Sequence, residues 1–361
     1  MHMADALISP AVGAIAWAAT GVVAAHSVKK IQNDIDDKKI PLMGVMGAFV
    51  FAAQMINFSI PGTGSSGHLG GGLLLSVILG PYAGFLSMAS VLLIQALFFA
   101  DGGLLAFGCN VFNLGFFTCF VAYPFVYGKL ARPGASAGRK SGAALLAAVL
   151  GLQLGAFAVV LETLLSGKTE LPFGTFALLM QPIHLAIGLV EGLVTAAIVA
   201  FVAKTSPEIL ERADSREGLG AASIRKTLAV LGVAALLVGG VLSWFASAYP
   251  DGLEWSMEKV SGGAELEAEG TVHKGLEALQ EKTAVMPDYG FKTTEGAKDA
   301  EAAETGAGPT RWPAVDGGTS VAGLLGGALT LALAALAGLA VKAAKARARR
   351  GKAAAREQAG R

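Results

Sequence analysis

The first residues of the chain, Met1-His2-Met3-Ala4-Asp5, contain donors that can chelate a metal ion. A free α-amine on Met1, the backbone nitrogen of His2 and Nδ1 of its ring form fused five- and six-membered chelate rings. With a fourth nitrogen from elsewhere they complete a square plane, the geometry that Ni(II) and Cu(II) prefer with nitrogen ligands. This arrangement predicts a nitrogen-rich metal site; an untethered terminal histidine is the plainer alternative.

The best candidate for the fourth nitrogen is His68, which lies in the Gly-rich stretch Ser65-Ser66-Gly67-His68-Leu69-Gly70-Gly71-Gly72. A loop histidine that is satisfied by backbone groups is the alternative. Metal ligands must be deprotonated, and an α-amine titrates near about 7.7–8.0. We therefore expect metal binding to weaken as the pH falls.

Three further ionisable residues, Glu162, His184 and Glu191, lie in apolar stretches. Ionisable groups inside a membrane are costly and often functional. His184 and Glu191 are seven residues apart and share one face of a helix, so they either pair inside the bundle or line a path for an ion. His273 lies in an acidic stretch, where a solvated side chain is expected.

The composition indicates that these residues are positioned by membrane helices. Of the 361 residues, 53% are hydrophobic and only 15% charged, against about 25% charged in a typical soluble domain. We predict an all-α integral membrane protein. The two cysteines exclude a disulfide framework, and no concentrated basic face indicates nucleic-acid binding.

Apolar runs between charges and Gly/Pro breaks predict nine crossings, arranged as seven plus two. Segment 70–80 is short, about 16 Å as a helix, so we expect it to be tilted, irregular or buried within the bundle. The predicted spans are 10–27, 41–57, 70–80, 82–100, 104–128, 142–166, 174–203, 226–248 and 320–341.

The charges predict the orientation. Basic loops stay in the cytoplasm, so Lys29-Lys30 and the basic tail 342–361 indicate an extracytoplasmic N-terminus and a cytoplasmic C-terminus. Residues 249–319 hold 14 acidic and 6 basic residues and form a predicted outer loop with a net charge of −8. No signal peptide is expected, since residues 1–10 lack a basic start. The predicted domains are 1–215 with seven spans, a cytoplasmic linker 216–225, 226–341 with two spans, and the tail 342–361.

Three motifs carry a resemblance over about residues 1–215: Met1 to Pro10, Asn57-Phe58-Ser59-Ile60-Pro61-Gly62, and Ser66 to Gly71. They resemble the CbiM/NikM family, the substrate-binding (S) components of energy-coupling-factor (ECF) transporters for cobalt and nickel. Pro250-Asp251-Gly252-Leu253-Glu254, just after a span, resembles the PDGLE-containing N component. The chain thus resembles an M–N fusion, which implies a seven-helix ECF S-component bundle plus a two-helix hairpin with an extracytoplasmic loop.

The resemblance implies that the metal ligands are the Met1 amine, the amide and ring of His2, and the ring of His68. Asn57, Ser66 and Gly67 would support them. The loop from Pro61 to His68 is one residue longer than the family's usual pattern. The Ala-Asp-Ala-Leu start and the PDGLE block favour Ni²⁺ as the transported substrate, with Co²⁺ as the alternative.

Residues Gly167-Lys168-Thr169 imitate the end of a phosphate-binding loop, but Glu162 stands where its first glycine is required. We therefore expect a transporter subunit, not an enzyme, with no organic cofactor. The resemblance implies a transmembrane coupling (T) subunit and ATPase subunits as partners, in the lipid of the cytoplasmic (inner) membrane, and no nucleic acid. A membrane scaffold or assembly protein that acts through 249–319 is the alternative from another class.

Overall fold

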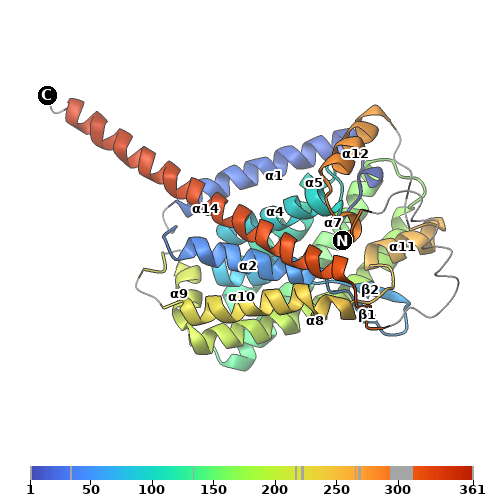
Figure 1. Cartoon of the computed structure of the whole chain (residues 1–361), viewed down its shortest axis with the longest axis horizontal. Coiled ribbons are helices and arrows are strands. Elements are labelled where there is room, and N and C mark those ends of the chain that lie inside the picture. The colour runs from blue at the N-terminus through green and yellow to red at the C-terminus, as the bar shows by residue number, and fades with distance from the viewer. Residues whose placement is uncertain are drawn as a thin grey trace.

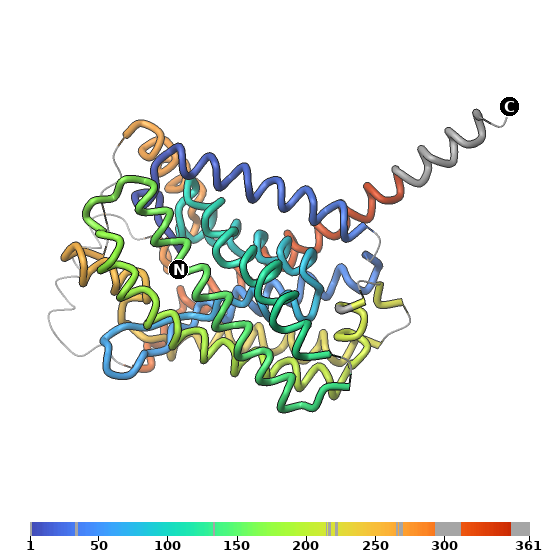
Figure 2. The backbone as a smooth tube through the Cα atoms, turned by 180° about the vertical axis from the view of Figure 1, so that it is seen from behind, coloured from blue at the N-terminus to red at the C-terminus, as the bar shows by residue number. Residues whose placement is uncertain are grey.

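The computed structural model describes residues 2–32, 35–132, 134–215, 218–220, 223–264, 266, 270–292 and 312–359, with only the backbone for residues 214 and 348–359. The protein is built almost entirely of helices that run side by side in one bundle (Figure 1). Seen from behind, the long helices again run along the bundle (Figure 2). The predicted ligand Met1 lies outside the described residues.

Six helical stretches in the described part of the chain are long and apolar enough to cross a membrane. The first begins at Pro10, where the Ser9 side chain accepts a hydrogen bond from the backbone N–H of Val12 and so caps the helix. The six are α1 (Pro10–Ile31), α4 with η2 (Pro81–Phe99), α5 (Phe107–Val111) with η3 (Phe112–Tyr127) and α6 (Gly128–Leu130), α7 (Ala137–Leu165), α8 (Phe173–Thr205), and the first part of α14 (Gly317–Ala359).

The remaining predicted spans coincide with shorter helices, α2 (Lys39–Gln54), α3 (Gly72–Leu79) and α10 (Arg225–Gly240). A helix needs about 20 residues to span the hydrocarbon core, and these three have 16, 8 and 16. The molecule is thus a multi-pass membrane protein, while the seven-plus-two count stays a prediction.

Helix α3 is a half-length helix inside the bundle, as the short segment 70–80 led us to expect. All of its residues are buried. Gly80, with φ 81°, reverses the chain into α4, and a Cβ on Gly84 would lie only 2.9 Å from the Leu75 carbonyl carbon. The stretch from His68 to Gly71 therefore enters the bundle as extended chain before α3 begins.

The all-α prediction missed one element, a short β-hairpin. Strands β1 (Phe58–Ile60) and β2 (Ser65–Gly67) pair in antiparallel fashion, with Phe58 opposite Gly67. Between them Gly62 and Gly64 adopt positive φ values of 77° and 73°, which glycine does without strain. Three-residue strands with Ser and Gly carry too little hydrophobic alternation to be recognised in a sequence.

The C-terminal helices α10 and α14 pack against α2. The contact is close because it is made by glycines: a Cβ on Gly44 would lie 2.9 Å from the Leu331 carbonyl oxygen, and one on Gly326 would overlap the Phe51 ring. The last part of α14 extends beyond the bundle (Figure 1). The short α9 (Pro207–Ser215) precedes α10.

The described part of the predicted outer loop 249–319 lies at the end of the bundle where Figure 1 marks the N-terminus. Its described part includes α11 (Gly252–Ser261), α12 (Thr271–Thr283) and the single turn η5 (Pro287–Tyr289). α11 begins with a capping box in which Asp251 and Glu254 satisfy each other's backbone N–H groups. Two further 3₁₀ turns, η1 (Asp5–Leu7) and η4 (Leu242–Phe245), complete the described elements.

Candidate functional site

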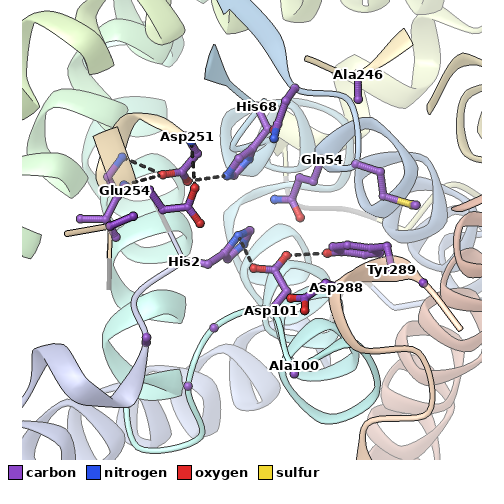
Figure 3. A pocket seen from close by; sticks show the side chains of 18 of the residues that line it. His2, Gln54, His68, Ala100, Asp101, Ala246, Asp251, Glu254, Asp288 and Tyr289 are labelled. Carbon is purple, nitrogen blue, oxygen red and sulfur yellow. Dashed lines mark hydrogen bonds and ion pairs between the residues drawn. The ribbon is translucent and has the colours of Figure 1, made fainter. Parts of the chain in front are cut away.

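A pocket of about 800 Å³ lies at this end of the molecule (Figure 3). Its walls come from segments far apart in the sequence: the N-terminal residues, the loop after β2, the loop before α5, and α11 and η5. The polar residues that line it include His2, Gln54, Asn57, His68, Asp101, Asp251, Glu254, Asp288 and Tyr289.

His2 and His68, the two predicted imidazole ligands, meet in this pocket. Their rings are stacked with centroids 4.9 Å apart and planes 3° from parallel. Both side chains are nearly buried, at 7% and 9% exposed. The structure thus brings together two histidines that are 66 positions apart in the chain.

The N-terminal segment is held by its backbone. The Met3 N–H donates to Asn110 Oδ1 at 2.8 Å, and the Met3 carbonyl accepts from Asn110 Nδ2 at 3.1 Å and from the Gly103 N–H at 2.8 Å. Asp5 accepts from the Ala106 N–H at 2.9 Å. The position of His2 is therefore set by the start of α5.

The His2 ring donates from Nδ1 to Asp101 Oδ1 at 3.1 Å (Figure 3). The Tyr289 hydroxyl donates to the other oxygen of Asp101 at 2.5 Å. Burial alone would raise the pKa of the Asp101 carboxyl, but His2 and Tyr289 hold it well below its usual range. Burial and the Asp101 charge together raise the pKa of Tyr289. Asp101 is therefore a carboxylate, and it holds the nitrogen of His2 that the predicted chelate needs.

His68 is kept as a neutral imidazole. Its Nδ1–H donates to the Leu69 carbonyl at 3.1 Å, so the lone pair is on Nε2, which lies 3.8 Å from Asp251 Oδ2. Burial, with the neighbouring His2, lowers the pKa of His68 to about 3. Burial would raise the pKa of Asp251, but the hydrogen bond from the Glu254 N–H acts to lower it, and the pKa lies below its usual range. A neutral imidazole whose other nitrogen is bonded to a carbonyl is the form that binds metals.

The segment before α11 binds the His68 loop through backbone groups. The Ser66 N–H donates to the Pro250 carbonyl at 2.8 Å and its hydroxyl to the Tyr249 carbonyl at 2.7 Å. The Ser247 N–H donates to the Asn57 carbonyl at 2.7 Å. Ser66, predicted to support the metal ligands, thus contacts the 249–319 segment, and Asn57, predicted for the same role, contacts Ser247 just before it. Gly67 packs on Ile187, where a Cβ would lie 2.4 Å from Cγ1.

The three intramembrane candidates lie in different places. Glu191 accepts from the N–H groups of Gly70 and Gly71 at 2.7 and 3.2 Å, and so anchors the extended chain before α3. His184 donates from Nδ1 to the Met180 carbonyl at 2.7 Å. Glu162 accepts from Asn113, whose amide also approaches the Met3 sulfur. His184 and Glu191 therefore have separate partners, and Glu162 belongs to the support of the N-terminal segment.

Sequence reasoning missed the roles of Asp101, Tyr289 and His273. Asp101 carried a signal, as a lone acidic residue between two apolar runs, whereas Tyr289 carried none. The expectation that His273 is solvated was wrong. It is 5% exposed and donates to the Ile8 carbonyl at 2.9 Å, because α12 packs against the N-terminal segment.

No group of three or more His, Cys, Asp or Glu side chains in the described residues is arranged to hold a metal ion. The predicted site does not need one, because two of its donors, the Met1 amine and the His2 amide, belong to the main chain. The structure brings the two predicted imidazole ligands, His2 and His68, side by side with stacked rings, and the ligand set stays a prediction.

The close fit of α11 yields a stability prediction. A Cβ on Gly252 would lie 2.5 Å from Ile183 Cγ2, whereas one on Gly275 in α12 would meet open space. Gly252→Ala is therefore expected to destabilise the protein by about 1–3 kcal/mol, and Gly275→Ala to be neutral or stabilising by up to about 1 kcal/mol. Thermal unfolding of both variants in detergent checks this. Equal midpoints would contradict the tight docking of α11.

Comparison with known proteins places the chain in a family. Residues 2–209 match the model of the cobalt uptake substrate-specific transmembrane region (CbiM), and residues 225–343 match the PDGLE domain. A putative fused nickel transport protein NikMN of Archaeoglobus fulgidus is 37% identical over 66% of this chain and 79% of its own length. The cobalt transport protein CbiM of Sorangium cellulosum is 32% identical over 59% and 95%.

The fused nickel transport protein NikMN of Rhodobacter capsulatus is 34% identical over 58% of this chain and 64% of its own length. The crystal structure of a truncated transition metal transporter superposes with a TM-score of 0.50 at 30% identity, over 57% of this chain and 99% of its own. The CbiM match includes His2 and His68, and the PDGLE match includes α11, α12 and Tyr289. The chain therefore belongs to the CbiM family of metal uptake proteins, in the form in which the CbiM region is fused to a PDGLE domain.

Proposed function

We propose that the protein binds Ni²⁺ at its extracytoplasmic end and mediates its uptake as the substrate-specific component of an ECF-type transporter. The ligands are the α-amine of Met1, the amide nitrogen and ring of His2, and the ring of His68. The observation that carries the proposal is the stacking of two nearly buried imidazoles, 4.9 Å apart, at the N-terminus. Four nitrogens in a plane suit Ni²⁺; the same role for Co²⁺ is the alternative.

Metal binding requires the His2 ring to change partners. Its Nδ1 donates to Asp101, so the chelate forms only when this nitrogen loses its proton and turns from the carboxylate to the metal. His68 needs no such change, since it is neutral. The carboxylates of Asp101 and Asp251 remain at the rim and partly balance the charge of the ion.

Transport itself needs energy from other chains. The sequence holds no complete phosphate-binding loop, so ATPase subunits and a membrane-embedded coupling subunit are proposed as partners. In this account the N-terminus and the 249–319 segment face outward, and the tail 342–361 faces the cytoplasm. The 249–319 segment contacts both the His68 loop and the N-terminal residues, which supports a role for the PDGLE domain in shaping the site.

The test is elemental analysis of the protein purified from cells grown with both metals, followed by isothermal titration with each. We expect one nickel ion per chain and tighter binding of Ni²⁺ than of Co²⁺. Cobalt in the purified protein would favour the alternative substrate. The absence of any bound transition metal, with intact mass confirming that the chain begins at Met1, would contradict the proposal.

Binding is expected to weaken as the pH falls. The α-amine titrates near about 7.7–8.0, and protons compete with the metal for this nitrogen. Because burial lowers the pKa of His68 to about 3, this ring adds no pH dependence between pH 8 and pH 6. The apparent affinity should drop about tenfold or more per pH unit below about 7.5. Titrations that give one affinity across this range would contradict an amine ligand.

A further inference from the structure

A second, smaller cavity lies behind His68. Its volume is about 10 Å³, close to the space of one water molecule. Three of the residues that line it carry polar side chains: His68, His184 and Asp251. The other residues that line it are Gly67, Gly70, Leu114, Leu152, Ile187 and Gly252.

His184 presents a bare nitrogen in this region. Its Nδ1 donates to the Met180 carbonyl at 2.7 Å, which leaves the lone pair on Nε2. This Nε2 is fully buried and has no hydrogen-bond partner in the described structure. A buried polar atom without a partner costs free energy. An imidazole that is oriented by a carbonyl through its other nitrogen is also how proteins prepare a metal ligand.

The small cavity adjoins the large pocket. His68 and Asp251 line both, so they form the wall between the outer site and His184. Gly252 closes the cavity from the side of α11, where a Cβ would lie 3.3 Å from His184 Cε1. On the opposite side is Gly70, whose N–H is held by Glu191. Among the described residues that line the small cavity, His68 and His184 carry imidazole rings, and only His68 also lines the large pocket.

We propose that this cavity is a second, transient position for the transported divalent metal ion, where His184 Nε2 replaces the donors of the N-terminus. The inference rests on the proposed function. A dehydrated divalent ion is smaller than a water molecule, and the cavity holds at most one such particle. Glu191 does not line the cavity, and its two oxygens accept from the N–H groups of Gly70 and Gly71. Glu162 lies on the other side of the site, against Asn113.

The experiment compares binding with uptake. His184→Leu in the full chain is titrated with Ni²⁺ by calorimetry, and uptake of radioactive nickel is measured in cells that also make the transporter's other subunits. We expect the affinity of the outer site to change less than about threefold and uptake to fall about tenfold or more. Thr195→Val is the matched control, since Thr195 is buried on the same helix and lines neither cavity.

Two results would overturn the inference: unchanged uptake in His184→Leu, or a parallel loss of outer-site affinity, which would make His184 a support of the outer site only. Should His184→Leu fail to fold, His184→Gln keeps a donor for the Met180 carbonyl but has no imidazole, and the same split between affinity and uptake is expected. A wild-type protein that binds no nickel would instead contradict the proposed function, so the two failures are distinguishable.

Discussion

Adding three residues ahead of Met1 is expected to weaken Ni²⁺ binding about 1000-fold or more, which corresponds to about 4 kcal/mol. The extension turns the Met1 amine into an amide and moves the new amine away from His2. The five-membered chelate ring is lost, and with it the amine that anchors the metal next to the His2 amide. Calorimetric titration of the purified full chain measures the effect.

The length of the extension matters. A single added residue would make the histidine third in the chain, where an amine, two amides and an imidazole complete a square plane without His68. A three-residue extension avoids this substitute site. The control is the same extension followed by a protease site that restores Met1 on cleavage. Nickel binding of equal affinity before and after cleavage would show that the amine is not a ligand.

Replacing His68 by alanine is expected to weaken Ni²⁺ binding about 100-fold or more, because one of the four proposed nitrogen ligands is lost. The N-terminal chelate persists in this variant, so the loss should be smaller than that caused by the extension. Water would take the fourth position and change the absorption spectrum of the bound nickel. Titration with parallel spectra measures both effects.

The matched control is His26→Ala. His26 lies at the far end of α1, where its ring contacts Tyr82, and its removal should leave the affinity unchanged. Thermal unfolding of His68→Ala separates lost ligation from lost structure, because His68 also packs on His2. A folded His68→Ala protein with wild-type affinity would remove His68 from the site.

The helices were predictable because apolar runs, and the charged, Gly and Pro residues that end them, are local features of the sequence. The expected breaks at Gly80-Pro81 and after Lys29-Lys30 fall near helix ends in the structure. The β-hairpin before His68 was not predictable, since its three-residue strands lack hydrophobic alternation and the carbonyl partners of the Ser66 hydroxyl, Tyr249 and Pro250, lie more than 180 residues away. Local patterns carry no information about such partners.

The two imidazoles of the candidate site could be predicted from chemistry that is local to each: the second position of the chain for His2 and the Gly-rich loop for His68. The residues that surround the two imidazoles could not be predicted in this way. Tyr289 reaches Asp101 across 188 positions, and α12 buries His273 although its segment is strongly acidic. The charge of a segment predicts its average solvation, but a single face of an amphipathic helix can still be buried.

The structure also sharpens the chemistry of His2. Chelation by Nδ1 is not a simple addition to a prepared site, because Asp101 holds that nitrogen. With the proposed ligands, the exchange of this carboxylate partner for a metal ion would couple metal binding to movement of the His2 side chain. The 249–319 segment contacts Asp101 through Tyr289 and lies near His68 through Asp251.

The measurement that tests the account most directly is X-ray absorption spectroscopy of the nickel-loaded full chain. The account predicts four nitrogen neighbours in a square plane, with the pre-edge feature typical of that geometry and the outer-shell scattering of two imidazole rings. A six-coordinate shell dominated by oxygen, or a shell that includes sulfur, would contradict the N-terminal chelate.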